Sequence, residues 1–359
     1  MFSRNTNGPP GEGRFAGKWP PGFAGGGPIR GEADPPPPAP ASPAGIGGPR
    51  PARADSRGNG RRDSRGIAPG ADTSWVTIPI PVEGPDVPVV TLLNQKGGVG
   101  KTSTVYHLAG ELALAGRRVL LVDADPQSSL TQGFLGPQAT RQLDPAVTIA
   151  AILAGDEPFP AQVVRPSGLR GVDLVPGSRS ASDSNLPRPH ELDWPTQVAL
   201  REFLAQVRGD YDLVLVDVPP NLHLCSWAAL VASTGLVVPL QPEDFGAQGI
   251  ADVRESVERV QAGPNPRLQL LGYLITMISV RRTVHRLYEN RLRQLYGDAV
   301  FAAMVPESVD FVEAIAQRKA VAQYKPKGAA AKAVRAIAAE LDIRMAAASP
   351  GIVPDQEAA

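Results

Sequence analysis

Short, uninterrupted runs of apolar residues recur along the chain from position 87 onward, and each run ends in polar residues or glycines. Such runs are typical of β-strands that are buried on both faces. The stretches between them are long enough for helices of about 10 to 15 residues. This alternation predicts an α/β fold, with a mainly parallel twisted sheet and helices on both of its faces. The expected strands are residues 87–93, 118–123, 213–217, 236–241 and 270–277.

Helical periodicity marks three segments. Residues 102–115 carry apolar side chains at i, i+3, i+4 and i+7, and Gly116 is a stop signal. Residues 283–296 predict an amphipathic helix, and residues 334–341 repeat at helical spacing again. Residues 132–195 are rich in Pro, Ser and Gly and allow only a loose assignment. The side chains expected on the buried side of the helix at 283–296 are Val284, Leu287, Tyr288, Leu292 and Leu295.

The N-terminal segment has a different composition. Residues 1–72 contain 16 Gly and 14 Pro but no Leu or Val. A segment with so little apolar area cannot offset the loss of backbone entropy on folding. We therefore expect a disordered Pro/Gly-rich tail at 1–84, and we place an α/β domain at 85–345 and a flexible C-terminal tail at 346–359.

Charge and cysteine content exclude several classes of protein. The net charge of zero divides into +4 for residues 1–72 and −4 for the rest, so a nucleic-acid site has to be a local patch. The single cysteine, Cys225, excludes a disulfide framework, and the four histidines lack metal-ligand spacing. Because there is neither a long uncharged apolar run nor a secretory signal, we expect a cytoplasmic protein without a membrane partner.

The strongest chemical signal is a glycine-rich segment between an expected strand and an expected helix. It reads Lys96, Gly97, Gly98, Val99, Gly100, Lys101, Thr102 and Ser103. Glycines let successive backbone N–H groups surround a phosphate chain, and the helix N-terminus adds positive potential. Lys101 is expected to bridge the β- and γ-phosphates, and the Thr102 hydroxyl is expected to ligate Mg²⁺. The standard phosphate-loop pattern is not met, because Gln95 stands at its first glycine position and Lys96 is an additional lysine.

Three aspartates follow apolar strands. Asp123 and Asp125 end one expected strand, and Asp217 ends another. In a parallel sheet these carboxyl ends meet at one edge, where ligands bind. The pattern predicts that Asp217 reaches Mg²⁺ directly or through water, and that the first two carboxylates hold a metal-bound water and orient the attacking water.

Together these segments resemble the ParA branch of the ParA/MinD superfamily of ATPases with a deviant Walker A loop. The resemblance covers roughly residues 87–345. It rests on the phosphate loop with its additional lysine and on four further motifs, at residues 123–127, 217–220, 238–243 and 276–277.

The resemblance implies ATP and Mg²⁺ as cofactors and roles for particular residues. Lys96 reaches the partner subunit's nucleotide in a homodimer that sandwiches ATP. Lys101 and Asp125 are the other catalytic residues, and Asp125 orients or activates the hydrolytic water. Asp123 lies close to the Mg²⁺ shell, and residues around Met277 and Pro306 border the adenine.

The chain departs from the family's pattern after its late proline. Where many ParA proteins carry arginines that grip DNA, this chain has Glu307 and Asp310. Two basic clusters offer another surface for nonspecific double-stranded DNA through phosphate contacts. The candidate residues are Arg281, Arg282, Arg286, Arg293, Arg318, Lys319, Lys325 and Lys327.

The function that the resemblance implies is ATP hydrolysis coupled to a DNA-bound dimer. A ParB-like or other stimulating partner triggers hydrolysis and release, which partitions a chromosome or plasmid and makes the protein nucleoid-associated. Two alternatives remain: positioning of a protein assembly on the nucleoid, and a nucleotide-dependent regulatory scaffold. A reductase with an intersubunit iron–sulfur cluster is disfavoured because Cys225 stands alone.

Overall fold

The computed structural model describes residues 87–242 and 247–348. The expected tail at 1–84 lies outside these ranges, as do residues 349–359 of the tail expected at 346–359. Within the described ranges, seven strands form one sheet in the order β3-β4-β2-β5-β1-β6-β7. All neighbouring strands are parallel except β3 and β4. The strands are β1 (Val89–Leu92), β2 (Val119–Asp123), β3 (Arg165–Pro166), β4 (Val172–Val175), β5 (Leu213–Asp217), β6 (Gly235–Leu240) and β7 (Gln269–Ile275).

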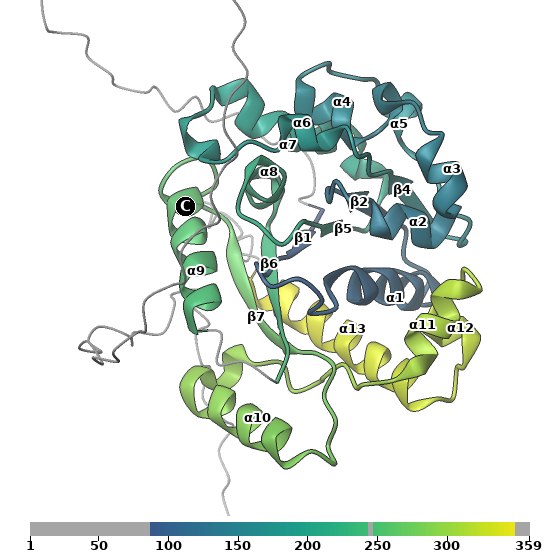
Figure 1. The fold of residues 1–359 in the computed structure, drawn as a ribbon, viewed down its shortest axis with the longest axis vertical. Coiled ribbons are helices and arrows are strands. Elements are labelled where there is room, and N and C mark those ends of the chain that lie inside the picture. Colours follow the sequence, from purple (N-terminus) through teal and green to yellow (C-terminus); the bar gives the residue numbers. More distant parts are fainter. Residues whose placement is uncertain (1–86, 243–246, 349–359) are drawn as a thin grey trace, which may run out of the picture. The chain divides into compact units, whose positions relative to one another are not determined.

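Helices cover both faces of the sheet, as Figure 1 shows. The helices before β5 are α1 (Lys101–Leu114), α2 (Ser129–Leu135), α3 (Pro137–Arg141), α4 (Ile149–Ala154), α5 (Pro160–Val163), α6 (Ala181–Ser184) and α7 (Trp194–Val207). Those after it are α8 (Leu224–Ala232), α9 (Ala247–Ala262), α10 (Thr283–Tyr296), α11 (Val309–Ala316), α12 (Val321–Tyr324) and α13 (Ala329–Ala348). None of them, in the described ranges, has the length and apolarity needed to cross a bilayer.

Two apolar cores lie on opposite faces of the sheet because strand side chains alternate in direction. In β2, Leu120 and Val122 join the core that α4, α7, α8 and α9 cover. Val119 and Leu121 join the other core, which α1, α2, α11 and α13 cover. The predicted α/β class and its mainly parallel sheet are thereby confirmed.

The five expected strands all form, within two residues of their predicted ends. The segment 132–195, which the sequence left loosely assigned, contains β3, β4 and several short helices. Strand β4 lacks a continuous apolar run because Asp173 interrupts it, and this carboxylate accepts a hydrogen bond from the Tyr211 hydroxyl at 3.0 Å. Helix α13 continues to Ala348, three residues past the expected domain boundary.

The prediction for the buried side of α10 is wrong in part. Tyr288 and Leu292 are buried as expected, but Val284, Leu287 and Leu295 are exposed by 58%, 63% and 38%. The helix lies at the edge of the domain, so the body contacts only a narrow arc of it (Figure 1). His285 belongs to this arc, where its Nδ1 accepts the N–H of Ser279 at 2.9 Å.

Candidate nucleotide site

The glycine-rich loop joins β1 to α1 at the carboxyl edge of the sheet. Gly98 and Gly100 have φ angles of 78° and 80°, in the left-handed region that glycine adopts without strain. Gly100 is the N-cap of α1, and no side chain caps the first N–H groups of this helix. Uncapped N–H groups at a helix N-terminus bind anions, so this loop is suited to hold phosphates.

The two lysines of the loop have different environments. Lys101 is only 7% exposed, and its Nζ donates to the carbonyl oxygens of Asn94 at 3.0 Å and Lys96 at 3.3 Å. Lys96 is exposed, and the Asn94 side chain accepts its backbone N–H at 2.9 Å. The loop therefore keeps Lys101 inside and presents Lys96 on the outside.

Thr102 and Asp217 form the centre of the site. The Thr102 hydroxyl donates to Asp217 Oδ2 at 2.6 Å. Asp217 is fully buried, and its second oxygen, Oδ1, has no hydrogen-bond partner within the part of the chain that the structure describes. A buried carboxylate oxygen without a donor fits a cation or its water, and Mg²⁺ in nucleotide sites commonly takes one or two carboxylates besides phosphates.

Asp123 lies beside Asp217 because the two are register partners of β2 and β5. Its Oδ2 accepts both the N–H and the hydroxyl of Thr131, at 2.8 and 2.6 Å. The Thr131 hydroxyl in turn accepts the backbone N–H of Gly177 at 2.7 Å. Asp123 therefore anchors α2 to the sheet in addition to lying near the expected metal shell.

Asp125 stands at the mouth of the site. It is 9% exposed, and its Oδ1 accepts the N–H of Gln127 at 2.9 Å. This bond turns the chain sharply after β2, as in an Asx turn. The carboxylate is thus fixed at one oxygen, and the described residues supply no hydrogen bond to the other.

Burial governs the ionisation of this cluster. It raises the pKa of Asp123 to about 7, and burial together with the neighbouring Asp123 raises the pKa of Asp217 well above its ordinary value. Burial also lowers the pKa of Lys101, although Asp217 and Asp125 act in the opposite direction. Two crowded carboxylates and one buried ammonium make a site that a divalent cation and phosphates would stabilise.

The two residues expected at the adenine come from loops that lie side by side. A parallel bridge joins Ile278 to Pro306, directly after Met277. Met277 has a φ of 53°, and its methyl carbon lies 3.4 Å from where a Cβ on Gly100 would be. The structure thus brings Met277 next to the phosphate loop, while the role at the adenine stays a prediction.

Besides Thr276, which lies in the motif at 276–277, other side chains that support the site were missed by sequence reasoning. The Asn94 amide donates to the Pro239 carbonyl at 2.7 Å, and Thr276 donates to the Val99 carbonyl at 2.8 Å, so two neighbouring strands fix the loop. Asn94 stands directly before the loop and could have been suspected from its place. Thr131 and Gly177 carry no local signal, because only the folded chain brings them to Asp123.

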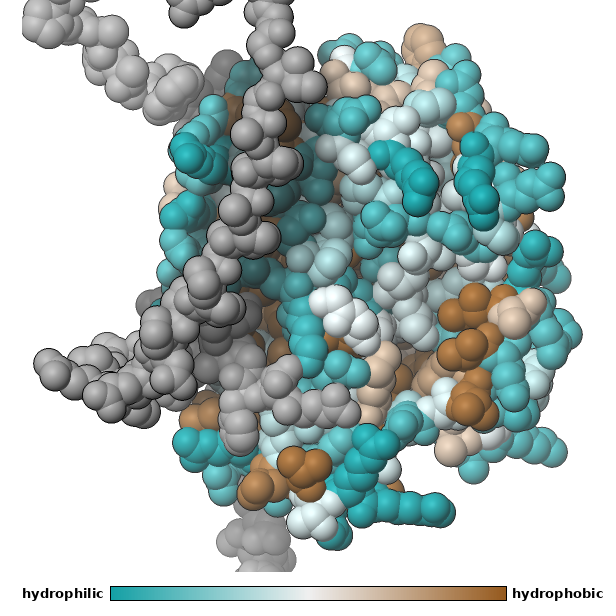
Figure 2. Space-filling view, in the orientation of Figure 1, coloured by the Kyte–Doolittle hydropathy of each residue, from teal (hydrophilic) through white to brown (hydrophobic). Residues whose placement is uncertain are grey.

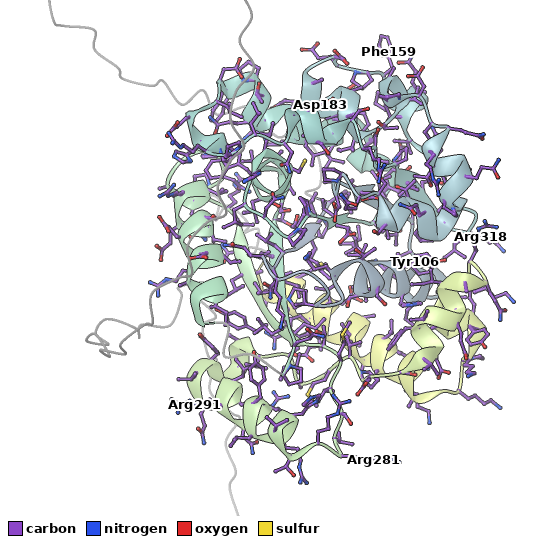
Figure 3. All side chains as sticks on the ribbon, viewed as in Figure 1. Tyr106, Phe159, Asp183, Arg281, Arg291 and Arg318 are labelled. Atoms are coloured by element: carbon purple, nitrogen blue, oxygen red, sulfur yellow. The ribbon has the colours of Figure 1, made fainter. Side chains whose placement is uncertain are left out.

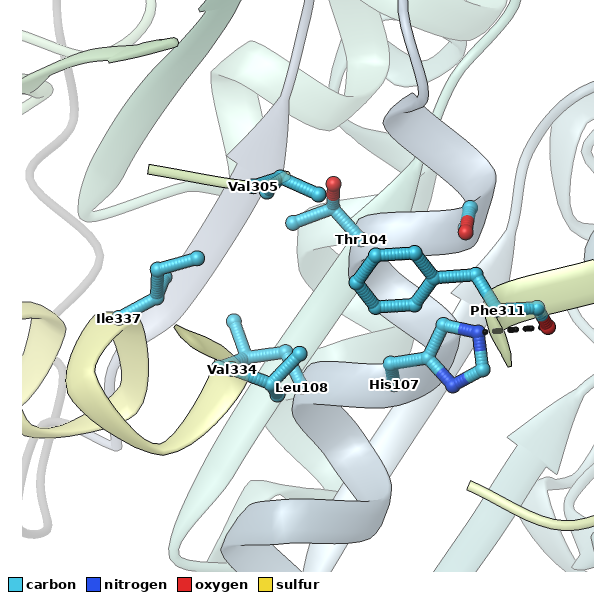
Figure 4. Close-up of a pocket in the computed structure, with 8 residues that line it drawn as sticks. Thr104, His107, Leu108, Val305, Phe311, Val334 and Ile337 are labelled. Carbon is cyan, nitrogen blue, oxygen red and sulfur yellow. Dashed lines mark hydrogen bonds between the residues drawn. The ribbon is translucent and has the colours of Figure 1, made fainter. Parts of the chain in front are cut away.

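Helix α1 is also fixed at its middle. His107 belongs to α1, and its fully buried side chain extends toward the helices α11 and α12. Figure 4 shows its ring beside Phe311. Thr104 and His107 line a small cavity of about 10 Å³ there, and the Thr104 hydroxyl has no hydrogen-bond partner in the described residues. Ser103, the last residue of the expected phosphate loop, borders the same cavity.

The proposed DNA-binding residues fall into two groups with different pairing. Arg282 pairs with Glu307 at 3.3 Å, and Arg293 pairs with Glu289 at 2.9 Å. Lys325 pairs with Asp310 at 2.5 Å and with Glu313 at 3.4 Å. The other five residues are exposed and form no ion pair within the described ranges: Arg281, Arg286, Arg318, Lys319 and Lys327.

The fold and the site together define a class of protein. A parallel sheet carries a glycine-rich anion loop, a buried lysine, a threonine hydroxyl and a strand-end aspartate, all at its carboxyl edge. This is the arrangement of a P-loop nucleoside triphosphatase.

Comparison with known proteins narrows this class. Residues 87–270 match a protein family described as an AAA domain. The chain is 39% identical over 256 residues to the chromosome-partitioning ATPase Soj of Thermus thermophilus, covering 71% of this chain and 96% of Soj. It is 35% identical over 257 residues to the chromosome partitioning protein ParA of Caulobacter vibrioides, covering 70% and 93%.

A solved structure gives the same result. Cobyrinic acid a,c-diamide synthase from Mycobacterium smegmatis, with bound ADP and magnesium, superposes with a TM-score of 0.57 at 28% identity. The match covers 72% of this chain and 93% of that one. The chain belongs to the ParA/MinD family of P-loop ATPases. The predicted family, the enzyme class and the cofactors ATP and Mg²⁺ are confirmed.

Proposed function

We propose that the protein is an ATP-driven switch that partitions DNA or positions a cargo along it. In this cycle ATP closes a homodimer, the dimer holds nonspecific double-stranded DNA, and a ParB-like or other partner stimulates hydrolysis and release. The observation that carries the proposal is the orphaned Asp217 Oδ1 beside the Thr102 hydroxyl, at the base of a loop that presents Lys96 to the outside. The unpartnered oxygen of Asp217 beside Thr102 fits a metal–nucleotide complex. The exposed Lys96 side chain fits a contact with another subunit.

Each site residue then has a definite task. Thr102 and Asp217 hold the cation, which supplies neutralisation of phosphate charge, and Asp123 keeps α2 close to it. Lys101 and the N–H groups of the loop and of Ser103 bind the phosphates. Asp125 orients the attacking water through the oxygen that Gln127 does not bind. Lys96 reaches the nucleotide of the other subunit.

The DNA-bound state uses the exposed arginines and lysines of the two basic clusters. Figure 3 shows Arg291 on α10 and Arg281 in the turn before it at one edge of the domain, and Arg318 beside α11 and α12 at another. Glu307 and Asp310 weaken this surface, because each pairs with one of the proposed DNA-binding residues. A nucleoid location follows from DNA binding, and the cargo is a chromosome, a plasmid or a protein assembly.

The test is binding to random-sequence duplex DNA with ATP, with ADP and without nucleotide, across a salt series. Asp125→Ala traps the ATP state. We expect DNA binding only in the presence of ATP, and the affinity for DNA should fall steeply as the salt concentration rises. Arg281→Gln/Arg286→Gln should weaken binding and reduce the salt slope by about 2, about 1 for each lost phosphate contact. The matched control is Arg141→Gln/Arg170→Gln, which removes two exposed arginines elsewhere.

Two results would contradict parts of the proposal. If no nucleotide state binds DNA while ATP still forms the dimer, the DNA step is wrong and the regulatory scaffold is favoured. If Lys101→Ala still binds and hydrolyses ATP normally, the role of the phosphate loop itself is wrong.

A further inference from the structure

Helix α10 exposes an apolar stripe to solvent. Besides Val284, Leu287 and Leu295, the preceding Val280 is 67% exposed. Val284, Leu287 and Leu295 follow one another at spacings of three and eight residues, so they lie on one side of α10, and Val280 lies in the turn that precedes the helix. Figure 2 shows apolar side chains gathered over α10 at the lower edge of the domain, beside hydrophilic ones.

The charges around this stripe have one sign. Residues 279–296 contain five arginines and a single acid, Glu289, which is already paired with Arg293. Arg281, Arg286 and Arg291 are exposed and form no ion pair within the described ranges. Figure 3 shows Arg281 and Arg291 extending away from the body of the domain. The stripe is therefore apolar except at Arg291, which lies between Leu287 and Leu295, and the unpaired charges beside it are positive.

This combination limits what can cover α10. A second copy packed α10 against α10 would bring arginines against arginines, with no free acid on this face to compensate. Duplex DNA would contact the arginines, as in the proposed function, but it would leave the four bulky apolar side chains without an apolar partner. The anionic surface of a lipid bilayer satisfies both, because headgroup phosphates meet the arginines and the acyl boundary takes the apolar side chains.

We propose that α10 is a peripheral docking element for anionic lipid bilayers. The helix lies in the plane of the surface, with Leu287 and Val284 inserted and Arg281 and Arg286 at the headgroups. Arg291 lies within the apolar line, and its long aliphatic stem lets the guanidinium reach the headgroups. His285, Tyr288 and Leu292 keep α10 attached to the domain while its outer side contacts lipid. Docking of this kind does not depend on the ATP cycle.

The experiment measures co-sedimentation of the full chain with vesicles, in the absence of nucleotide. Vesicles of phosphatidylglycerol and phosphatidylcholine are compared with vesicles of phosphatidylcholine alone. We expect binding to the first kind only. Leu287→Gln should weaken it at least about 10-fold, because inserting one leucine side chain changes an equilibrium by that factor or more. Leu114→Gln is the matched control, since Leu114 is 55% exposed on α1, and it should change binding less than about twofold.

A neutral substitution separates lipid from DNA. Leu287→Gln leaves every arginine in place, so affinity for duplex DNA should stay unchanged while vesicle binding falls. Arg281→Gln/Arg286→Gln should weaken binding to both. If Leu287→Gln lowers the thermal midpoint by more than a few degrees, the isosteric Val284→Thr replaces it in the same comparison.

Two outcomes would overturn the inference. In the first, the wild-type chain does not sediment with the anionic vesicles. In the second, Leu287→Gln sediments with the anionic vesicles as well as the wild-type chain does. Vesicle binding would then be due to positive charge alone, including the arginines in residues 50–65. ATP hydrolysis is assayed separately, so a failure here leaves the proposed function untouched.

Discussion

The imidazole of His107 joins the phosphate-loop helix to the C-terminal helices through Phe311. Its Nε2 lies 3.2 Å from the Phe311 carbonyl oxygen, and its Nδ1 accepts the N–H of Val321 at 3.0 Å. Because Nδ1 is an acceptor, Nε2 carries the proton and the ring is neutral. One side chain of α1 thus satisfies backbone groups at α11 and at the first residue of α12.

This arrangement predicts acid sensitivity. Burial lowers the pKa of His107 to about 4, whereas an unfolded histidine has a pKa of about 6.5. Between these two pH values the histidine binds a proton in the unfolded chain but not in the folded one. The contribution of neutral His107 to the free energy of unfolding is therefore fully present above about pH 6.5 and is lost as pH falls toward 4. The loss from this group should be about 2 kcal/mol at pH 5 and should reach roughly 3 kcal/mol only below pH 4. Urea unfolding at pH 7.5 and pH 5 measures it.

The control for the acid effect is a non-titrating variant. His107→Asn keeps an acceptor near the Val321 N–H but removes the titration, so it should be less stable at pH 7.5 and lose less stability between the two values. His190→Asn replaces an exposed histidine and should keep the wild-type pH dependence. Equal pH dependence in wild type and His107→Asn would show that the ring is not the titrating group.

Asp125→Ala should abolish hydrolysis while preserving ATP binding. Asp125 stands at the mouth of the site, and only one of its oxygens accepts a hydrogen bond from the described residues, so it is placed to orient water. Asp217 Oδ1 is also without a hydrogen bond from these residues, but it is fully buried and assigned to the cation. Loss of a water-orienting base lowers turnover by about 100-fold or more. Phosphate release and nucleotide titration calorimetry measure the two effects. Asp183→Ala, an exposed aspartate on α6, serves as control, and an unchanged turnover for Asp125→Ala would refute the role.

The fold was predictable from sequence wherever one local pattern decided the outcome. Apolar runs such as that of β5 mark strands buried on both faces, and the glycines before Lys101 mark the phosphate loop. Thr131 and Gly177 could not be found this way, because their contact with Asp123 arises only when β2, α2 and β4 come together. Leu287 shows a further limit: its apolar character indicates burial, but the periodicity of α10 does not say which arc the domain covers.

Gly177→Ala tests the packing beneath the site. A Cβ at this position would lie 2.7 Å from the Asp123 carboxyl carbon and 3.0 Å from the Ser128 hydroxyl, closer than atoms pack. The backbone has to shift, which weakens the Gly177 N–H bond to Thr131 and costs about 1–3 kcal/mol. Thermal unfolding measures the loss. Gly209→Ala has no atom within 4 Å of the added Cβ and should be nearly neutral. Equal stability of the two variants would mean that the loop after β4 accommodates the methyl group.

Lys96→Ala should separate nucleotide binding from dimer formation. The Lys96 side chain is exposed and its backbone N–H is fixed by Asn94, while Lys101 is buried against the loop's own carbonyls. Removing Lys96 therefore leaves the pocket of its own subunit intact, so ATP affinity should change less than about threefold. The dimer should be lost, because the ammonium that would reach the opposite nucleotide is absent and a desolvated charge pair is worth at least a factor of ten.

Sedimentation velocity with ATP in the Asp125→Ala background measures this effect, because hydrolysis no longer depletes the ATP state. Lys332→Ala removes an exposed lysine from α13 and should leave the dimer unchanged. If Lys96→Ala dimerises as well as its control, the lysine does not act across the interface. If Lys96→Ala does not bind ATP at all, the Lys96 side chain contacts the nucleotide of its own subunit. A role at the partner's nucleotide would then be wrong, although the side chain is exposed.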